Sequence, residues 1–487
     1  MAVKHGIFVY ENDTALSAPI TADSAVQTVI GTAPVWMLDD PAAVTNVPIL
    51  CASATEAMER LGFVDDFQKY TLCQTMYLTS NLFPVAPVVY INVLDVATMR
   101  KTAETVSLTA PVDSRVVIDK EAVIKGTVVI KQGTGNAETT LVKDEDYTLE
   151  YNSEGKLVIN FVPDSDFDST KATTVSVTCA NIAAVNAAAI IGSYNVSTGK
   201  ATGAELIQYV YPKLGVIPSI IIAPGFSQIS EVGIALYAKA ANINGVFKGM
   251  AIVDIDTAQA AIYTAVKTVK ENSGFTSPFC YPVWPCFNVG SYIFAGSAVT
   301  AAMTAYNDAQ NGNVPSRTPS NKLAGITGTC LADGTEVLLN QDQGTIVNSY
   351  GVATAINMNG WRLWGSYTGA YPAINDVKDM WVPVRRMFNW HANNFILTYF
   401  DKVDDPLNVV LVESIVDSEN IRCAAYTPDA WAGAEIQYLQ SDNPTTDLLA
   451  GKIVFRQKIA PYTPAQEIDN ILSYDTSLLA ASLAGLE

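Results

Sequence analysis

Few residues of this sequence are of the types and spacings that catalyse reactions. The chain of 487 residues contains two histidines, His5 and His391, and no Gly-x-Ser-x-Gly motif. Neither histidine has a serine or cysteine partner in a recognisable motif. His391 lies one turn from Phe388 and Phe395 in a predicted amphipathic helix, which favours a histidine at the edge of a core over a general base.

Asp254 and Asp256 are the best-placed carboxylates, because they end and follow a predicted strand at 249–254. Catalytic groups of α/β enzymes lie at such strand ends, and carboxylates there also cap helices. Asp256 directly precedes a predicted helix at 257–270. Helix capping is therefore the favoured interpretation.

The segment Gly192–Lys200 has the composition of a phosphate-binding loop. Six residues separate Gly192 from the Gly199-Lys200 pair, where the motif needs four, and no Ser or Thr follows Lys200. A loop of this length would not wrap a phosphate with the right set of backbone amides. Nucleotide binding is not predicted.

The aromatic and thiol side chains also have structural interpretations. Tryptophans at 361, 364, 381 and 390 could form a sugar-binding platform, but clustered tryptophans are more often packing or interface residues. The seven cysteines, at 51, 73, 179, 280, 286, 330 and 423, are odd in number and irregularly spaced. They predict neither a zinc site nor a disulfide framework, and buried free thiols fit synthesis in a reducing cytosol. We expect no catalytic residue, metal or cofactor, and a chain that is not an enzyme.

Composition points to surfaces that other subunits cover. Hydrophobic residues make up 49% of the chain and charged residues 16%, compared with about 25% charged residues in a typical soluble domain. The alternative explanation is a large core with polar loops. The formal net charge of −19 argues against nucleic-acid binding, which needs a basic face. No signal peptide and no membrane-spanning segment are expected, since no stretch approaches 18 apolar residues.

The predicted fold class is α/β, with a mixed core that has a mostly parallel sheet. Residues 1–25 form an extended arm whose β-prone run, Gly6–Tyr10, has no hairpin partner. Strands alternate with helices over 26–97 and 184–375, which predicts the α/β core. Within this core, 307–345 is expected to be a long ordered loop.

Two further units have different patterns. Residues 98–183 alternate polar and apolar positions with period two between turns, which predicts an inserted antiparallel, β-sandwich-like domain. Residues 376–487 predict a C-terminal α+β sheet domain with a terminal strand arm. Its expected helices are 381–400 and 407–423, followed by strands at 434–439, 451–459 and 466–474.

The order of several motifs resembles the tail sheath proteins of contractile phage tails, R-type bacteriocins and related contractile injection systems. The opening from His5–Val9 to Val29–Pro34, the turn Ala223–Ser227 and the strand Ala251–Asp254 are similar to the family's. A more specific match is Gly360–Thr368, followed by Val384-Arg385-Arg386. The family commonly has Asn-Arg where this chain has Ser366-Tyr367.

The resemblance implies a structural subunit that polymerises into a helix of stacked hexameric rings around an inner tail tube protein. It implies contraction from a metastable extended state to drive the tube through a cell envelope, with viral genome ejection in a phage. It implies baseplate and tail terminator proteins as partners, no nucleic acid and no membrane insertion. It places the protein in a virion tail or bacteriocin particle made in the bacterial host cytoplasm.

The resemblance also implies which residues join subunits, because relatives add terminal strands to a neighbour's C-terminal sheet. The expected donor residues are Gly6, Ile7, Phe8, Val9 and Tyr10 in the N-terminal arm, and Glu467, Ile468, Ile471 and Leu472 in the C-terminal arm. The expected acceptor residues are Ile436, Tyr438, Ile453 and Phe455. The family's variable insert, here 98–183, would face outward.

Two other classes of function stay open at this point. An α/β enzyme or ligand-binding protein with a lectin-like β-insert would have a deep polar pocket beside Asp254. Another phage structural protein, such as a tube or capsid component, would usually be shorter or differently patterned.

Overall fold

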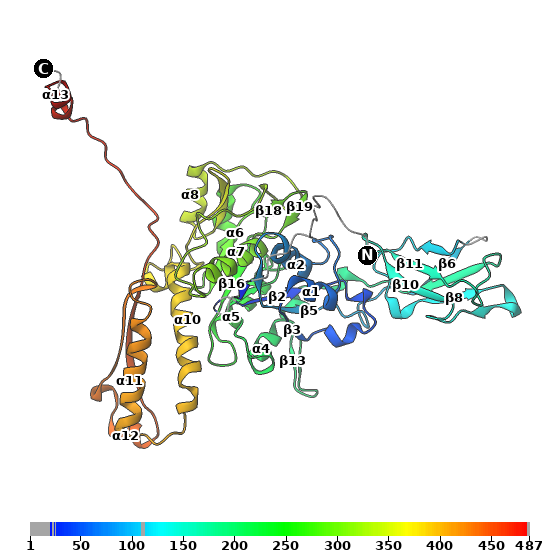
Figure 1. Ribbon diagram of the computed structural model, residues 1–487, viewed down its shortest axis with the longest axis horizontal. Helices are drawn as coiled ribbons and strands as arrows, with labels where there is room; N and C mark the ends of the chain where they lie inside the picture. The colour runs from blue at the N-terminus through cyan, green and yellow to red at the C-terminus, as the bar shows by residue number, and fades with distance from the viewer. Residues whose placement is uncertain (1–19, 22–23, 25, 109–112, 485–487) are drawn as a thin grey trace, which may run out of the picture.

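The computed structural model describes residues 20–21, 24, 26–108 and 113–484. Figure 1 shows a central α/β body, a β unit that projects from one end, and a helical arm and long tail at the other. The predicted N-terminal strand Gly6–Tyr10 lies outside the described residues. Among the described helices, none is long and apolar enough to cross a membrane.

The body is built on a six-stranded sheet, so the α/β class is confirmed. Its strands, in spatial order, are β17 (Cys280–Val283), β16 (Met250–Asp254), β15 (Ile220–Ile222), β2 (Gln27–Gly31), β5 (Val88–Asn92) and β3 (Pro48–Cys51). The first five strands are parallel and β3 is antiparallel to β5. Every residue of β2, β5, β15 and β16 is buried, as expected for parallel strands that are covered on both faces.

Helices cover this sheet. They are α1 (Ala54–Leu61), α2 (Leu72–Asn81), α4 (Ile207–Leu214), α5 (Ser230–Ala241), α6 (Val266–Asn272), α7 (Gly296–Gln310) and α8 (Gln341–Ser349). α7 is buried along most of its length and contacts β15, β16 and β17. It is therefore the central helix of the body.

Two predictions in this region were wrong. The helix expected at 257–270 begins only at Val266. In the preceding segment the Ala260 carbonyl accepts a hydrogen bond from Trp284 Nε1 at 2.9 Å. The loop expected at 307–345 contains the strand β20 (Gly328–Cys330) and the start of α8.

Residues 98–183 contain two antiparallel sheets. One is ordered β10 (Tyr147–Tyr151), β11 (Leu157–Phe161), β7 (Arg115–Val117), and the other β6 (Glu104–Leu108), β12 (Thr173–Val177), β8 (Val129–Gln132), β9 (Thr139–Thr140). A hydrophobic cluster separate from that of the body fills this unit; it includes Ile130, Leu157, Ile159 and Val175. The period-two pattern thus reflects strands with one face on a small core of their own.

The chain ends in two helices, two strands and a tail. The helices α10 (Val382–Tyr399) and α11 (Val409–Ala424) are followed by β23 (Trp431–Tyr438) and β24 (Phe455–Pro461), which pair antiparallel. The tail ends in α13 (Thr476–Ala484) and extends away from the rest of the chain (Figure 1). The strand expected at 466–474 is not formed within this chain, because the segment has no strand partner among the described residues.

Polar bonds fasten α10 to the body. Arg386 forms a two-pronged ion pair with Asp308 of α7, and both side chains are buried. Asn389 Nδ2 donates to the Gly249 carbonyl at 2.9 Å. Asn393 bonds both backbone groups of Lys248, at 2.9 and 2.8 Å. One stripe of α10 therefore holds the C-terminal unit against α7 and the residues that precede β16.

Removing Arg386 should strongly destabilise the fold. We expect Arg386→Leu to lower the free energy of unfolding by about 3–5 kcal/mol, because Asp308 would be left buried and unpaired. The double variant Asp308→Leu/Arg386→Leu should recover most of this loss. Urea unfolding measures the stability of both variants. The control is Arg115→Leu, which removes an exposed ion pair with Glu150 and should lower the free energy of unfolding by less than about 1 kcal/mol. Equal losses in Arg386→Leu and Arg115→Leu would contradict the assignment.

Lys270 should make stability depend on pH. Its ammonium is buried and donates to the Tyr350 and Tyr371 carbonyls at 2.7 and 2.6 Å, and burial lowers its pKa to about 8. Between that value and the ordinary 10.5, the unfolded chain binds more protons, so stability rises with pH. Between pH 8 and 10, the wild type should gain about 2 kcal/mol relative to Lys270→Met. The same difference in unfolding free energy between the two proteins at pH 8 and at pH 10 would exclude this effect.

Candidate functional site

The carboxylate at the end of β16 has a structural role. Asp254 is buried and accepts hydrogen bonds from Ser227 Oγ and Ser297 Oγ, each at 2.6 Å, and from the Ser297 backbone N–H at 2.7 Å. Burial raises its pKa. It caps the N-terminus of α7. The expected capping of a helix at 257–270 by Asp256 was wrong, because no helix begins there. Asp256 only closes a turn, in which it accepts from the Ala258 N–H at 2.9 Å.

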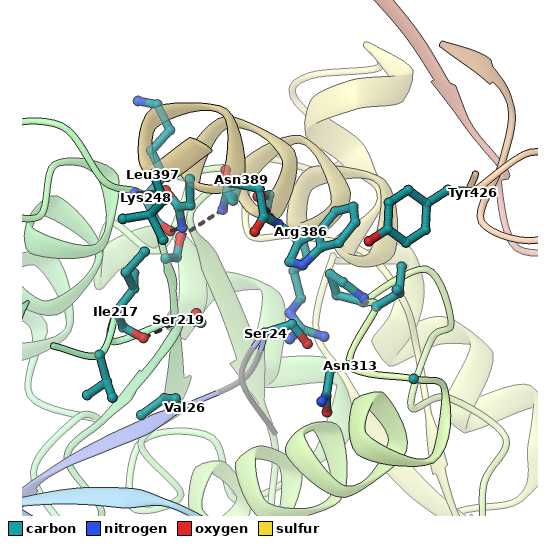
Figure 2. Close-up of a pocket in the computed structure, with 18 of the residues that line it drawn as sticks. Ser24, Val26, Ile217, Ser219, Lys248, Asn313, Arg386, Asn389, Leu397 and Tyr426 are labelled. Carbon is teal, nitrogen blue, oxygen red and sulfur yellow. Dashed lines mark hydrogen bonds between the residues drawn. The ribbon is translucent and has the colours of Figure 1, made fainter. Parts of the chain in front are cut away.

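The body has a cavity at its joint with α10, shown in Figure 2. Its volume is about 420 Å³, and its lining includes Ser24, Lys248, Arg386, Asn389 and Asn393. The charge of Arg386 is already matched by Asp308, and the two asparagines bond the backbone of the body. Asp254 does not line this cavity, so it is not the pocket that the enzyme interpretation requires.

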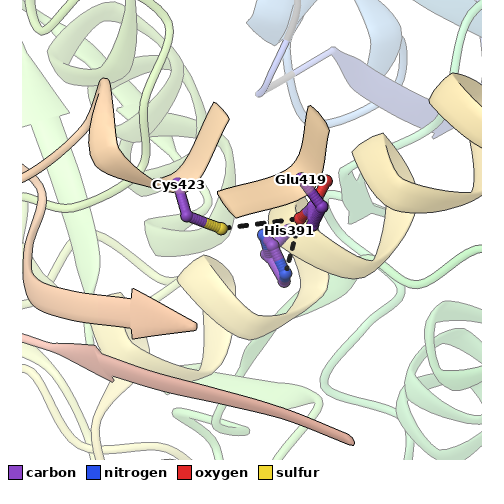
Figure 3. Close-up of side chains that lie close together, drawn as sticks. All are labelled: His391, Glu419 and Cys423. Carbon is purple, nitrogen blue, oxygen red and sulfur yellow. Dashed lines mark hydrogen bonds and ion pairs between the residues drawn. The ribbon is translucent and has the colours of Figure 1, made fainter. Parts of the chain in front are cut away.

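Three potential metal ligands lie together where α10 meets α11 (Figure 3). His391 Nε2 and Cys423 Sγ are each 3.5 Å from Glu419 Oε1, and all three side chains are buried. Distances of this size suit the edges of a tetrahedral site with His, Cys and carboxylate ligands. Whether this cluster can bind a metal ion depends on what else the Glu419 carboxylate binds.

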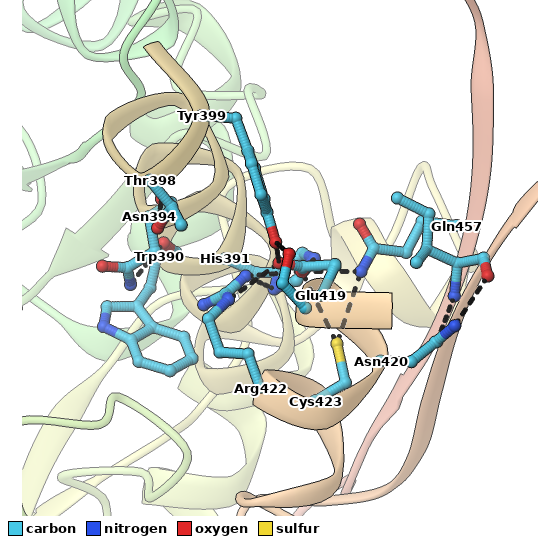
Figure 4. Close-up of polar contacts among 12 residues, drawn as sticks. Trp390, His391, Asn394, Thr398, Tyr399, Glu419, Asn420, Arg422, Cys423 and Gln457 are labelled. Carbon is cyan, nitrogen blue, oxygen red and sulfur yellow. Dashed lines mark hydrogen bonds and ion pairs between the residues drawn. The ribbon is translucent and has the colours of Figure 1, made fainter. Parts of the chain in front are cut away.

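The Glu419 carboxylate is already saturated, as Figure 4 shows. Arg422 donates to both oxygens, at 2.6 and 2.8 Å. Gln457 Nε2 donates to Oε1 at 2.9 Å, and the Tyr399 hydroxyl donates to Oε2 at 3.1 Å. A cation would have to displace the guanidinium from a buried pair, which disfavours metal binding.

This network connects the elements of the C-terminal unit. Tyr399 and His391 come from α10, Glu419 and Arg422 from α11, and Gln457 from β24. Arg422 Nη2 lies 3.3 Å from His391 Nδ1, and burial lowers the pKa of His391. His391 is thus a buried structural residue at this joint, and the network fixes β24 to both helices.

The predicted acceptor residues lie on or beside the strand pair. Tyr438 is opposite Phe455 in the register, and Ile436 is opposite Gln457. Ile436 is 1% exposed. Ile453 was expected in a strand but precedes β24, and it lines a groove beside β23 instead. β23 and β24 form a sheet of two strands, so each has one edge without a strand partner among the described residues.

The predicted C-terminal donor residues lie in the tail, beyond β24. Ile468, Ile471 and Leu472 are 84%, 90% and 86% exposed, and Glu467 is exposed beside them. The apolar residues Leu478, Leu479 and Leu483 of α13 are also exposed. An apolar segment this exposed is typical of an interaction site. The N-terminal donor residues lie outside the described part of the chain.

The groove beside β23 has a volume of about 680 Å³. It is lined by α11 residues Val409, Val412, Glu413, Val416, Asp417 and Asn420, by Glu435 to Tyr438 of β23, and by Leu407, Asn408, Leu448 and Ile453. No local sequence pattern predicts this groove or the Glu419 network, because both join residues from separate elements. The exposed leucines of α13 could have been noticed as an apolar run close to the C-terminus.

The motif Gly360–Thr368, which carries the resemblance, contains the strand β22 (Trp361–Trp364). This strand forms a hairpin with β21 (Thr354–Asn357). Trp361 and Trp364 pack against the main core. Tyr367, at the position that departs from the family pattern, stacks between Tyr371 and Trp381, with ring centroids 3.8 and 4.4 Å apart. These aromatic residues pack within the protein and do not form an open sugar-binding platform.

Comparison with known proteins finds similarity to phage tail sheath proteins. No protein-family model matches the chain. The tail sheath protein of Burkholderia phage BcepMu is 25% identical over 99% of this chain and 98% of its own length. The tail sheath protein of Escherichia phage P2 is 23% identical over 58% of this chain and 68% of its own length.

Two solved structures share the fold over nearly the whole chain. A chain of the 6-fold symmetrised cryo-EM structure of the anti-feeding prophage baseplate has a TM-score of 0.58 at 13% identity and covers 98% of this chain. A chain of the contracted sheath complex of an extracellular contractile injection system has a TM-score of 0.56 at 12% identity, also over 98%. These matches cover 100% and 99% of the respective chains. The chain is thus similar over its full length to a phage tail sheath protein, and it shares the fold of these two contractile injection system chains.

Proposed function

We propose that this chain is the structural subunit of a contractile tail sheath that polymerises around an inner tube. One observation carries the proposal: within the described part of the chain, a two-stranded sheet whose outer edges have no strand partner occurs together with an exposed apolar tail. The tail of one copy can add a strand to the two-stranded sheet of a neighbouring copy. The chain would then act by assembly and not by catalysis.

The physical basis is strand addition across subunits. A strand of about six residues adds roughly five backbone hydrogen bonds, each with a net value of about 0.5–1.5 kcal/mol. The tail is long enough for this, because residues 462–475 separate β24 from α13 and span up to roughly 50 Å when extended. A subunit that donates an arm and accepts another is linked head to tail. Such an interface propagates as an open helix.

Links of this kind are compatible with contraction of the sheath. Subunits joined by flexible arms can rotate as rigid bodies while the strand additions persist, and a contracted lattice that buries more surface needs no chemical fuel. In this proposal, the inner tail tube, baseplate and tail terminator proteins are the partners, and hexameric rings are the repeating unit. The particle is a virion tail or a bacteriocin made in the host cytoplasm.

The proposal divides the chain by task. The core of 26–97 and 184–375 carries the load, and residues 98–183 face outward. Residues 376–487 form the linking domain, and residues 1–25 form the second arm. Support for this division comes from the separate hydrophobic cluster of the insert and the distal position of the C-terminal strand pair.

Charges placed on the C-terminal arm should abolish assembly without affecting the fold. We expect the triple variant Ile468→Asp/Ile471→Asp/Leu472→Asp to keep the wild-type unfolding midpoint, because these side chains are 84–90% exposed. It should form no tubes, because three carboxylates cannot be buried against a neighbour's sheet. Electron microscopy and urea unfolding provide the two measurements.

The control is Val196→Asp, which changes a side chain that is 85% exposed in the hairpin of β13 (Tyr194–Asn195) and β14 (Lys200–Ala201). This variant should still form tubes. Normal tubes from the triple variant would show that the C-terminal arm does not link subunits.

A further inference from the structure

Two cysteines lie opposite each other in a small sheet that packs on the main core. The strands of this sheet, in spatial order, are β19 (Tyr292–Phe294), β18 (Cys286–Val289) and β20, and neighbouring strands are antiparallel. Cys286 of β18 is the direct register partner of Cys330 of β20. Among the strands and bridges that the structure describes, no other two cysteines are partners in this way.

Both thiols belong to the face of this sheet that points away from the core. Successive strand residues point to opposite faces, and Phe287 and Val289 are buried in the main core. Cys286 and Asn288, which alternate with them, are only half-buried. The Cys330 thiol is buried, but it shares this face, because its Sγ donates to Asn288 Oδ1 at 3.0 Å. Cys286 is therefore the thiol that solvent reaches first.

The spacing of the pair suits a disulfide. Directly opposed residues of antiparallel strands have Cα atoms about 4.5–5.5 Å apart, within the range of about 4.4–6.8 Å for disulfides. Their Cβ atoms are about 4.5–5.5 Å apart, whereas disulfides need about 3.5–4.5 Å. A small approach of the two strands is therefore enough, with rotation of the Cys330 side chain away from Asn288. Both cysteines are free thiols in this structure.

We propose that Cys286 and Cys330 form an oxidation site, at which a low-molecular-weight disulfide such as oxidised glutathione converts the two thiols into a cross-strand disulfide after the chain has folded. The Cys286 thiolate attacks a sulfur of the reagent, which releases one reduced thiol. The Cys330 thiolate then attacks the Cys286 sulfur of the mixed disulfide and releases the second reduced thiol. The protein S–S bond replaces that of the reagent, and the two electrons and two protons of the cysteines pass to the released thiols.

Burial determines how fast this reaction runs. It raises the pKa of Cys330 to about 11 and also raises the pKa of Cys286. Because only the thiolate reacts, the exchange is slow at neutral pH and becomes about ten-fold faster for each unit of pH. A reducing cytosol keeps both thiols free while the chain folds, and oxidising surroundings outside the cell favour the disulfide. That extracellular setting rests on the proposed function, but the chemistry of the pair does not.

The disulfide would close a loop that contains the central helix of the body. Residues 287–329 lie between the two cysteines, and α7 is among them. A cross-link around a loop of this length reduces the conformational entropy of the unfolded chain. The oxidised protein should therefore unfold at a higher temperature than the reduced protein, by about 5 °C.

Thiol mapping of the full-length protein tests the proposal. The reduced protein is incubated with oxidised glutathione at about pH 8.5, denatured in an excess of N-ethylmaleimide, and digested for mass spectrometry without reduction. We expect two of the seven thiols to escape alkylation, and one cross-linked peptide pair that contains Cys286 and Cys330. The reaction should run about ten-fold more slowly at one pH unit below this value. Dithiothreitol should restore both thiols and reverse the gain in the thermal midpoint.

Two variants separate the pair from the other cysteines. Cys286→Ser should give no cross-linked peptides and no shift of the thermal midpoint with oxidised glutathione. Cys179→Ser is the matched control, because that buried cysteine is bridged to Val123 and has no cysteine opposite it. This control should form the cross-link between Cys286 and Cys330 at the wild-type rate.

Several results would overturn the proposal. They are seven alkylated cysteines after prolonged treatment, a cross-link between other cysteines or between two chains, and a glutathione adduct that stays on Cys286 without passing to Cys330. An unchanged thermal midpoint after complete cross-linking would refute the stabilising role of the bond. The experiment needs no tubes, so a protein that forms the disulfide but never polymerises contradicts the proposed function alone.

Discussion

The structure depends on a simple constraint: backbone hydrogen-bonding groups at a strand edge need partners. The main sheet and the two sheets of the insert satisfy most of this need within the chain. Among the described residues, the β23–β24 pair has no strand partner on either side, and the Asn420 side chain bonds one edge at Ile436. A sheet this small is marginal in water by itself. Its completion by other copies of the chain would therefore explain both the sheet and the tail that leaves it.

A link between subunits transmits force only if it is rigidly attached to the body. The Glu419 network fixes β24 to α10 and α11, and the stripe of Arg386, Asn389 and Asn393 fixes α10 to the body. Both connections are polar and directional. They define one relative position of the C-terminal unit, whereas an apolar contact tolerates sliding. The His391, Glu419 and Cys423 cluster is part of the first connection. The cavity lined by Arg386, Asn389 and Asn393 lies at the second.

Local patterns predicted the elements whose partners are in the same chain. The period-two runs at 147–161 became β10 and β11, and the helical spacing from Trp381 to Tyr399 became α10. The strand expected at 466–474 is absent because its alternation has no partner among the described residues. The helix expected at 257 begins only at Val266, and the segment before it is bonded to Trp284, a contact between distant residues that no local pattern shows. For the same reason, sequence alone could not show that Asp254 caps α7 or that Asn420 bonds Ile436.

The most direct test of the account is electron microscopy of the purified full-length protein at high concentration. The account predicts hollow helical tubes, with a lumen wide enough for an inner tube and continuous density from each subunit's arms into the β23–β24 sheet of a neighbour. Discrete particles that stay small under all salt conditions would contradict it, as would tubes in which each tail folds back on its own subunit.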